Sequence, residues 1–297
     1  EKHLRKSRRE GTTLNESILA RLRGRPDDEE FSAHYTVDAY FPIVDSANQI
    51  LARAKGKSLS PAEQERLQRI QDHQDLLAGT INGMVAVGRL EDDPTKSEDL
   101  KMLKEAIALR EAARAKLKAY APTLTKHLDD DDAKEEFQLN PTGPYAKLAQ
   151  RSAPPTLEPV AIPNGTFESL TAADADKALK FDPKGSAKLK LLEAGASEGK
   201  KAIQVTTGQD GHATLVFDAT LKPGALYRLS FEYRGKIAMH RYDYTRLSPW
   251  VTFQPKLKDI PLWGAASVGD ISAWRPFRFV FEAAAAQQKI ILGYHQV

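Results

Sequence analysis

The sequence predicts two domains of different class, an N-terminal antiparallel helical bundle and a C-terminal antiparallel β-sandwich. Up to Tyr120 the apolar residues recur at helical spacing, and after Leu189 they alternate with polar residues. A proline-rich stretch separates the two patterns and disfavours helix there. We therefore expect a helical domain at residues 1–145, a linker at 146–162 and the sandwich at 163–297.

The first half contains one strong helix start. Ser60 can cap a helix, Pro61 suits its first position, and Glu63 can complete a capping box. A long helix should follow, with an apolar stripe of Leu67, Ile70, Leu77, Ile81, Met84 and Val85. After the break at Glu91–Pro94, a second amphipathic helix should run to Ala121-Pro122. Two long helices joined by a short turn should pack antiparallel.

Two other stretches of the first half have simple interpretations. Apolar spacing from Phe31 to Leu51 predicts another helix, which Pro42 must start or kink. The run Asp129 to Asp132 lacks the alternate spacing and glycine of a calcium loop, so we interpret it as a solvated acidic turn.

The second half reads as short strands separated by turn residues. One predicted strand has Tyr227, Leu229, Phe231 and Tyr233 on one face and Arg228, Ser230, Glu232 and Arg234 on the other. Similar alternation marks three further groups: Ala213, Leu215 and Phe217; Phe277, Phe279 and Phe281; and Ile290, Leu292 and Tyr294. Repeated short strands of this kind are typical of an antiparallel sandwich.

Composition excludes several function classes. The chain has 43 Lys and Arg against 40 Asp and Glu, a net charge of +3 that does not indicate nucleic-acid binding. It has no cysteine, hence no disulfide and no thiolate site. No apolar run approaches the ~18 residues of a membrane span, so we expect no membrane insertion. The chain begins without Met or a signal-peptide pattern, which suggests the interior of a longer polypeptide.

Four segments of the second half resemble a known family. They are Asn164-Gly165-Thr166-Phe167-Glu168, Gly199 to Val205, Leu221 to Phe231, and Trp274 with the strands that follow it. Together they resemble the jelly-roll carbohydrate-binding modules of families four, nine and twenty-two. The resemblance covers residues 163–297 and implies a jelly roll that ends before its usual last strand.

The resemblance also implies a structural calcium ion. In such modules the ion is held by the acidic residue of the opening motif, by backbone carbonyls and by an aspartate of the last strand. Glu168 matches the first of these, whereas the chain ends at His295-Gln296-Val297 without the aspartate. Calcium at Glu168 is one alternative, and pairing of Glu168 with a nearby lysine is the other.

Sugar recognition uses flat aromatic faces and planar polar groups. The candidates for carbohydrate binding are Trp250, Trp263, Tyr242, Tyr244, Glu232 and Arg234. Gln254 and Arg278 are further polar candidates, and Trp274 is a further aromatic one. For the aromatic residues the alternative is packing in the core. For Glu232, Arg234, Arg278 and Glu282 it is a cross-strand ion-pair network.

No catalytic motif is visible. The sequence has no HExxH pattern, no GxSxG elbow, no phosphate loop and no carboxylate pair placed as acid and nucleophile. The helical half is similar to the C-terminal helical regions of large bacterial glycoside-hydrolase-like proteins, in which a catalytic barrel precedes the helices. That similarity leaves open whether the parent protein is a glycoside hydrolase.

The first functional hypothesis is therefore a non-catalytic part of a secreted, cell-surface or periplasmic carbohydrate-active protein, whose sandwich binds a polysaccharide. The alternative is a structural or interaction module of a cell-surface or multiprotein assembly that binds no glycan. In that case a partner chain would add a strand at an open edge of the sandwich.

Overall fold

The computed structural model describes residues 37–123, 139–206, 212–237, 250–257, 263–264 and 269–295. The chain divides between Leu157 and Glu158 into two compact units. We call these the helical unit and the β unit. As predicted, helices make up the N-terminal part and antiparallel sheets the C-terminal part.

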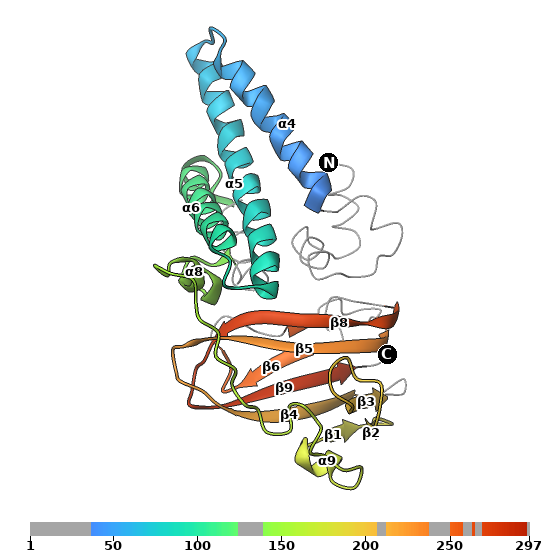
Figure 1. Cartoon of the computed structure of the whole chain (residues 1–297). Coiled ribbons are helices and arrows are strands. Elements are labelled where there is room, and N and C mark those ends of the chain that lie inside the picture. Colours follow the sequence, from blue (N-terminus) through green and yellow to red (C-terminus); the bar gives the residue numbers. More distant parts are fainter. Residues whose placement is uncertain are drawn as a thin grey trace. The chain divides into compact units, whose positions relative to one another are not determined.

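The helical unit contains four described helices. They are α4 (Val37–Lys55), α5 (Pro61–Asp92), α6 (Ser97–Tyr120) and α8 (Pro144–Ala149), and Figure 1 shows α4 and α5 joined as a hairpin. Helix α4 contains Pro42 and begins before it, at Val37, so the proline does not start the helix. Helix α8 occupies the start of the predicted linker, and Tyr145 within it is fully buried.

The predicted start of α5 is confirmed. The Ser60 hydroxyl accepts a hydrogen bond from the Glu63 backbone N–H at 3.4 Å, and the Glu63 carboxylate accepts one from the Ser60 N–H at 2.8 Å. Pro61 occupies the first helical position, where its missing N–H removes no intrahelical bond. This reciprocal cap fixes the point at which the chain turns from α4 into α5.

The apolar stripe predicted for α5 is correct in the second half of the helix and wrong at Ile70. Ile81, Met84 and Val85 are at most 3% exposed, whereas Ile70 is 57% exposed. Tyr120, the last residue of α6, contacts Arg69 and Asp72, which lie three residues apart and share one face of α5. Ile70 lies between them in sequence but outside this face, so α6 does not cover it.

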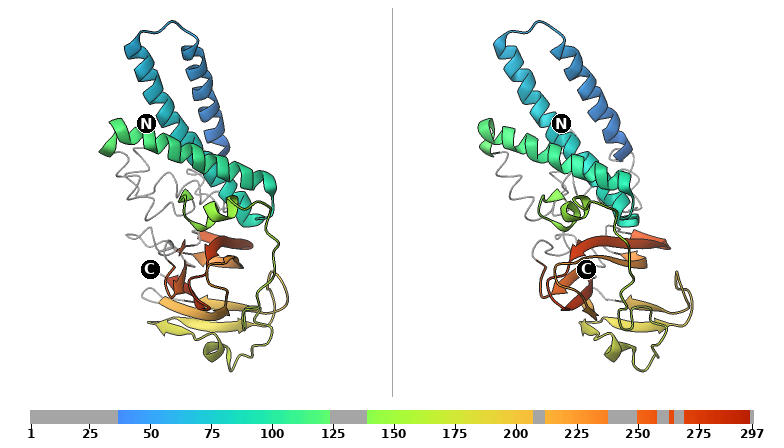
Figure 2. Two further views of the ribbon diagram at one scale, coloured as in Figure 1. Left: turned by 90° about the vertical axis from the view of Figure 1, so that its left-hand side faces the viewer. Right: turned by 60° about the vertical axis from the view of Figure 1, so that its left-hand side comes forward.

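Helices α5 and α6 run antiparallel, as predicted. Asp72 near the start of α5 meets Lys116 near the end of α6, whereas Arg89 near the end of α5 pairs with Asp99 at the start of α6. The views in Figure 2 show α6 crossing over α5. At this crossing Gly79 leaves no room for a larger residue. A Cβ built there would lie 2.9 Å from the Ala106 carbonyl oxygen and from the Arg110 backbone nitrogen.

The β unit contains one five-stranded sheet in the order β1-β4-β9-β6-β7 and two strand pairs, β2-β3 and β5-β8. The strands of the larger sheet are β1 (Asp182–Lys184), β4 (His212–Thr220), β9 (Gln287–His295), β6 (Trp250–Gln254) and β7 (Trp263–Gly264). The strand pairs are formed by β2 (Lys188–Leu192) with β3 (Ala202–Thr206), and by β5 (Leu226–Ile237) with β8 (Gly269–Glu282). All pairings are antiparallel. A short helix, α9 (Ala175–Ala178), precedes β1.

Strand β9 lies inside the five-stranded sheet. It pairs with β4 on one side and with β6 on the other (Figure 1), so the last described strand of the chain is not an open edge. The edges of this sheet are β1 and β7, which have 3 and 2 residues.

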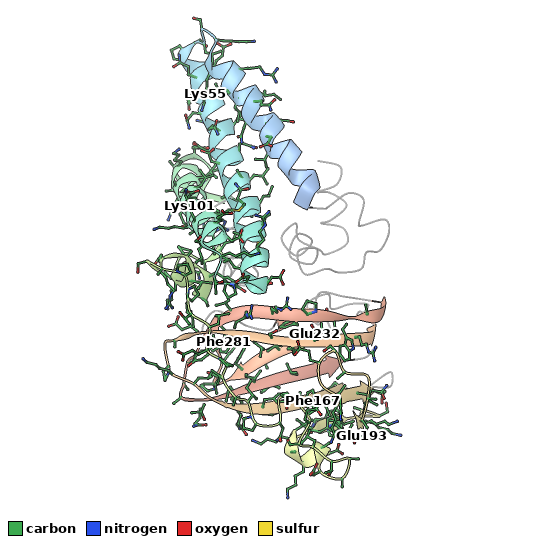
Figure 3. All side chains as sticks on the ribbon, in the orientation of Figure 1. Lys55, Lys101, Phe167, Glu193, Glu232 and Phe281 are labelled. Atoms are coloured by element: carbon green, nitrogen blue, oxygen red, sulfur yellow. The ribbon has the colours of Figure 1, made fainter. Side chains whose placement is uncertain are left out.

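Aromatic side chains join β5-β8 to the larger sheet. The Phe281 ring of β8 lies 4.8 Å from the Phe253 ring of β6 and 5.9 Å from the Tyr227 ring of β5. Phe281 and Phe253 are 2% and 4% exposed, and Figure 3 labels Phe281 on this pair of strands. The predicted alternation is confirmed in β4, where Ala213, Leu215, Phe217 and Ala219 are buried while the residues between them are half-buried. Phe281 and Phe253 thus connect β5-β8 with the larger sheet through a buried contact.

Candidate functional site

The solvent-facing side of the five-stranded sheet presents an ordered polar surface. Strand register aligns Asp218 of β4 with Lys289 of β9, and Lys289 in turn with Gln254 of β6. We call these three residues the polar row. The two neighbouring rows consist of Val216, Ile291 and Thr252, and of Thr214, Gly293 and Trp250. Lys289 and Gln254 are exposed, whereas Ile290 and Phe253 beside them in sequence are buried.

A depression of about 300 Å³ adjoins the polar row. It is lined by Asp218, Gln254, Pro255, Gln287, Gln288 and Lys289. The Gln288 side chain serves the local structure, because its Nε2 donates to the Pro255 carbonyl at 2.8 Å and its Oε1 accepts from the Ala284 N–H at 3.3 Å. Gln287 Nε2 donates to the Thr220 hydroxyl at 3.4 Å.

The remaining polar groups differ in what they bind. The Asp218 carboxylate accepts a hydrogen bond from the ammonium group of Lys180, which approaches from the turn before β1. Within the described part of the chain, no hydrogen bond or ion pair occupies the Gln254 or Lys289 side chain. The depression therefore offers an amide and an ammonium group to a ligand, beside a carboxylate that is already neutralised.

The two predicted tryptophans occupy adjacent strands with different register partners. Trp250 begins β6 and pairs with Gly293 and Gly264, whereas Trp263 of β7 pairs with Val251. Alternate residues of a strand share a face of the sheet. Trp250 and exposed Gln254 are both on β6 and an even number of residues apart, so their backbone positions belong to the same face. Trp263 pairs with buried Val251, so its backbone position belongs to the opposite face. Register thus groups only Trp250 with the polar row.

Glu232 and Arg234 lie on a different sheet. Both are exposed on β5, and Figure 3 labels Glu232 on this strand. The Arg234 guanidinium lies 4.7 Å from the centre of the Trp274 ring and donates to the Gly195 carbonyl at 3.0 Å. Register places Glu232 opposite Pro276. The structure therefore does not bring these two residues together with the polar row, and one face of Trp274 is covered by a cation.

Two other predicted site residues, Tyr242 and Tyr244, lie outside the described residues. The polar segment of residues 239–246 that contains them, which we interpret as a binding loop or an exposed hairpin, therefore stays a prediction.

Glu168 closes the loop between β2 and β3. Its Oε1 accepts hydrogen bonds from the backbone N–H groups of Lys200 at 2.7 Å and Lys201 at 2.9 Å. Gly199 makes this approach possible: its φ is +73°, and a Cβ there would lie 2.4 Å from Glu168 Oε1. The Lys201 ammonium donates to the Leu170 carbonyl at 2.6 Å. Lysine residues thus meet Glu168 through their backbone, and calcium at this carboxylate stays a prediction.

The same two hydrogen bonds make the stability of this loop depend on pH. The backbone N–H groups of Lys201 and Lys200 hold the pKa of Glu168 below its ordinary value of 4.5. A carboxyl whose pKa is lowered by folding stabilises the folded protein above the unfolded-state pKa, and this contribution is lost as the pH falls through the folded-state pKa. We expect Glu168→Gln to lower the melting temperature at neutral pH and to have a diminishing effect below about pH 4.5.

Thermal unfolding of both proteins between about pH 3 and pH 7 measures this difference. Glu198→Gln is the matched control, since Glu198 is an exposed residue of the same loop. A difference between wild type and Glu168→Gln that stays constant over this range would contradict the role assigned to the carboxylate.

Polar clusters in the helical unit are explained by helix packing. Asp72, 3% exposed, accepts from Gln68 Nε2 at 2.9 Å and from the Tyr120 hydroxyl at 3.2 Å, and pairs with Lys116 at 3.4 Å. Burial and the neighbouring Asp72 carboxylate raise the pKa of Tyr120. The cluster thus joins the start of α5 to the end of α6.

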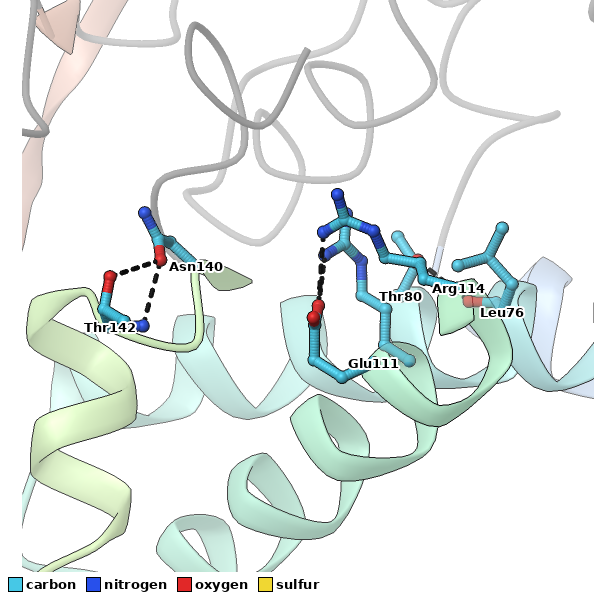
Figure 4. Close-up of polar contacts among 7 residues, drawn as sticks. Leu76, Thr80, Glu111, Arg114, Asn140 and Thr142 are labelled. Atoms are coloured by element: carbon cyan, nitrogen blue, oxygen red, sulfur yellow. Dashed lines mark hydrogen bonds and ion pairs between the residues drawn. The ribbon is translucent and has the colours of Figure 1, made fainter. Parts of the chain in front are cut away.

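Two further polar contacts lie in the helical unit, one on α6 and one in the turn before α8 (Figure 4). On α6 the Arg114 guanidinium lies 3.2 Å from the Glu111 carboxylate. In the turn, Asn140 Oδ1 accepts hydrogen bonds from both the backbone N–H and the hydroxyl of Thr142 at 2.9 Å. No group of three or more His, Cys, Asp or Glu residues that could hold a metal ion occurs among the residues that the structure describes. Within the same residues, no helix is long and apolar enough to cross a membrane.

Sequence reasoning identified Gln254 as a polar candidate but missed Asp218 and Lys289. Both were visible as the polar members of alternating strands, since Asp218 follows Phe217 and Lys289 precedes Ile290. The missing information was the order of the strands, which places β4, β9 and β6 side by side.

Comparison with models of known protein families and with curated proteins finds no match to this chain.

Proposed function

We propose that the β unit is a jelly-roll-like carbohydrate-binding module that binds a polysaccharide on the outward face of its five-stranded sheet. One observation carries this proposal: Asp218, Lys289 and Gln254 stand side by side on three adjacent strands and line a depression. Carboxylate, ammonium and amide groups on a rigid sheet can bind sugar hydroxyls without the entropic cost of ordering a loop.

The neighbouring rows add further polar groups. Thr252 and Thr214 are half-buried and supply hydroxyl groups on the same face as the polar row. A chain of sugars running along β9 would meet the polar row and then these hydroxyl groups.

Binding fits the depression better than hydrolysis does. A glycosidase uses two carboxyl groups on either side of the scissile bond. Among the residues lining the depression, Asp218 is the only carboxylate, and it pairs with Lys180. We therefore assign recognition to this surface, as part of a secreted or surface carbohydrate-active protein.

Isothermal titration of the full chain with neutral polysaccharides such as xylan, mixed-linkage glucan and galactan tests the proposal. We expect measurable binding, which Gln254→Ala weakens by about fivefold to tenfold through loss of the amide hydrogen bonds. Ser230→Ala, an exposed change on β5, should leave the affinity unchanged. If no polysaccharide binds, neutral or acidic, or if both substitutions have the same effect, the proposed surface is wrong.

A further inference from the structure

We propose that the glycan bound by this surface is acidic, and that Lys289 binds the carboxylate of a uronic acid. This inference rests on the proposed function and names the ligand class. Its starting point is the charge of the polar row. Asp218 and Lys289 are direct cross-strand neighbours, but the Asp218 carboxylate is engaged by Lys180.

Because Lys180 pairs with Asp218, the positive charge of Lys289 is not balanced by Asp218. Asp218 and Lys180 are each about half exposed, at 48% and 51%, and they neutralise one another. Lys289 is exposed, and within the described residues its ammonium group has no ion-pair partner. The other side chains lining the depression are three glutamines and one proline, which carry no charge. The site as a whole therefore has a net charge of one positive unit.

Lys289 does not protect an edge of the sheet. Exposed lysines often protect the edge of a sheet from pairing with other chains. Strand β9 is paired on both sides, so Lys289 protects no edge. On β6, the other neighbouring strand, Gln254 lies opposite Lys289. The amide N–H of Gln254 can donate to the same ligand carboxylate that Lys289 binds.

These groups match one carboxylate. An ammonium and an amide N–H on adjacent strands can each donate to one oxygen of a carboxylate, and hydrogen bonds to charged groups are stronger than neutral ones.

The test compares polygalacturonate and polyglucuronate with their carboxyl-reduced, neutral forms, using the full chain at near-physiological salt. We expect the acidic polymers to bind at least about tenfold more tightly than the neutral forms. Lys289→Gln should remove about tenfold of the affinity for the acidic forms and leave that for the neutral forms within about twofold. Lys190→Gln is the matched control, because it removes an exposed lysine from β2, outside the depression.

The outcomes separate this inference from the proposed function. Equal affinity for acidic and neutral forms, or equal losses in Lys289→Gln and Lys190→Gln, would overturn the acidic ligand and leave glycan binding intact. Binding to neutral polysaccharides without binding to either acidic polymer would also overturn the acidic ligand and leave glycan binding intact. An absence of binding to acidic and neutral polymers alike would overturn both.

Discussion

Phe281→Ala is expected to destabilise the β unit by about 3–5 kcal/mol. Phe281 is 2% exposed and packs on Phe253 of the facing sheet and on Tyr227 of its neighbouring strand. Removing the ring therefore opens a cavity between the two sheets, and the sheets cannot close it without bending. If the two sheets share one core, this single change weakens both.

Unfolding by denaturant measures this loss within the β unit alone. All 3 tryptophans of the chain, Trp250, Trp263 and Trp274, belong to this unit, so tryptophan fluorescence follows its unfolding. Ser230→Ala, on the exposed face of β5, is the control and should stay within about 0.5 kcal/mol of wild type. A Phe281→Ala protein as stable as the control would show that β5-β8 does not pack on the larger sheet.

Gly79→Ala is expected to destabilise the helical unit by about 1–3 kcal/mol. Alanine would improve helix propensity by up to about 1 kcal/mol, which acts in the opposite direction. The added Cβ, however, would lie 2.9 Å from two backbone atoms of α6, and backbone cannot rotate away as a side chain can. Helices α5 and α6 must separate to admit it, so the packing loss is the larger effect.

Far-UV circular dichroism follows this unfolding, since the long helices dominate the signal. Gly56→Ala is the matched control: a Cβ there would lie 3.6 Å from its nearest neighbour, the Arg53 carbonyl oxygen, which is an ordinary contact. We expect no loss of stability in that variant. A Gly79→Ala protein that gains stability would mean that the two helices lie further apart than the structure places them.

Local sequence signals predicted much of the fold. Ser60, Pro61 and Glu63 gave the start of α5, because a helix cap depends on residues adjacent in sequence. Adjacent residues also explain the turn at Lys222-Pro223-Gly224, where the Ala225 N–H donates to the Lys222 carbonyl at 3.1 Å. Strand alternation was equally readable, since a period of two is a property of one strand.

Features that depend on distant segments were not predictable. Ile70 belongs to the apolar stripe by its spacing, but its exposure depends on which face of α5 the distant helix α6 contacts. Asp218 and Lys289 are separated by a long stretch of chain, and only the order β4-β9-β6 makes them neighbours of Gln254. Strand order is set by the packing of the whole unit, and alternation within each strand carries no information about it.

The position of a bound glycan is the most direct test of the central claim, that the outward face of the five-stranded sheet binds sugar. Backbone amide chemical shifts, recorded while the full chain is titrated with an oligosaccharide of a polymer that binds, locate the ligand residue by residue. We predict the largest shift changes at Asp218, Gln254 and Lys289 and in the strands that carry them. Changes confined to Glu232, Arg234 and their neighbours on β5, with the polar row unaffected, would contradict it.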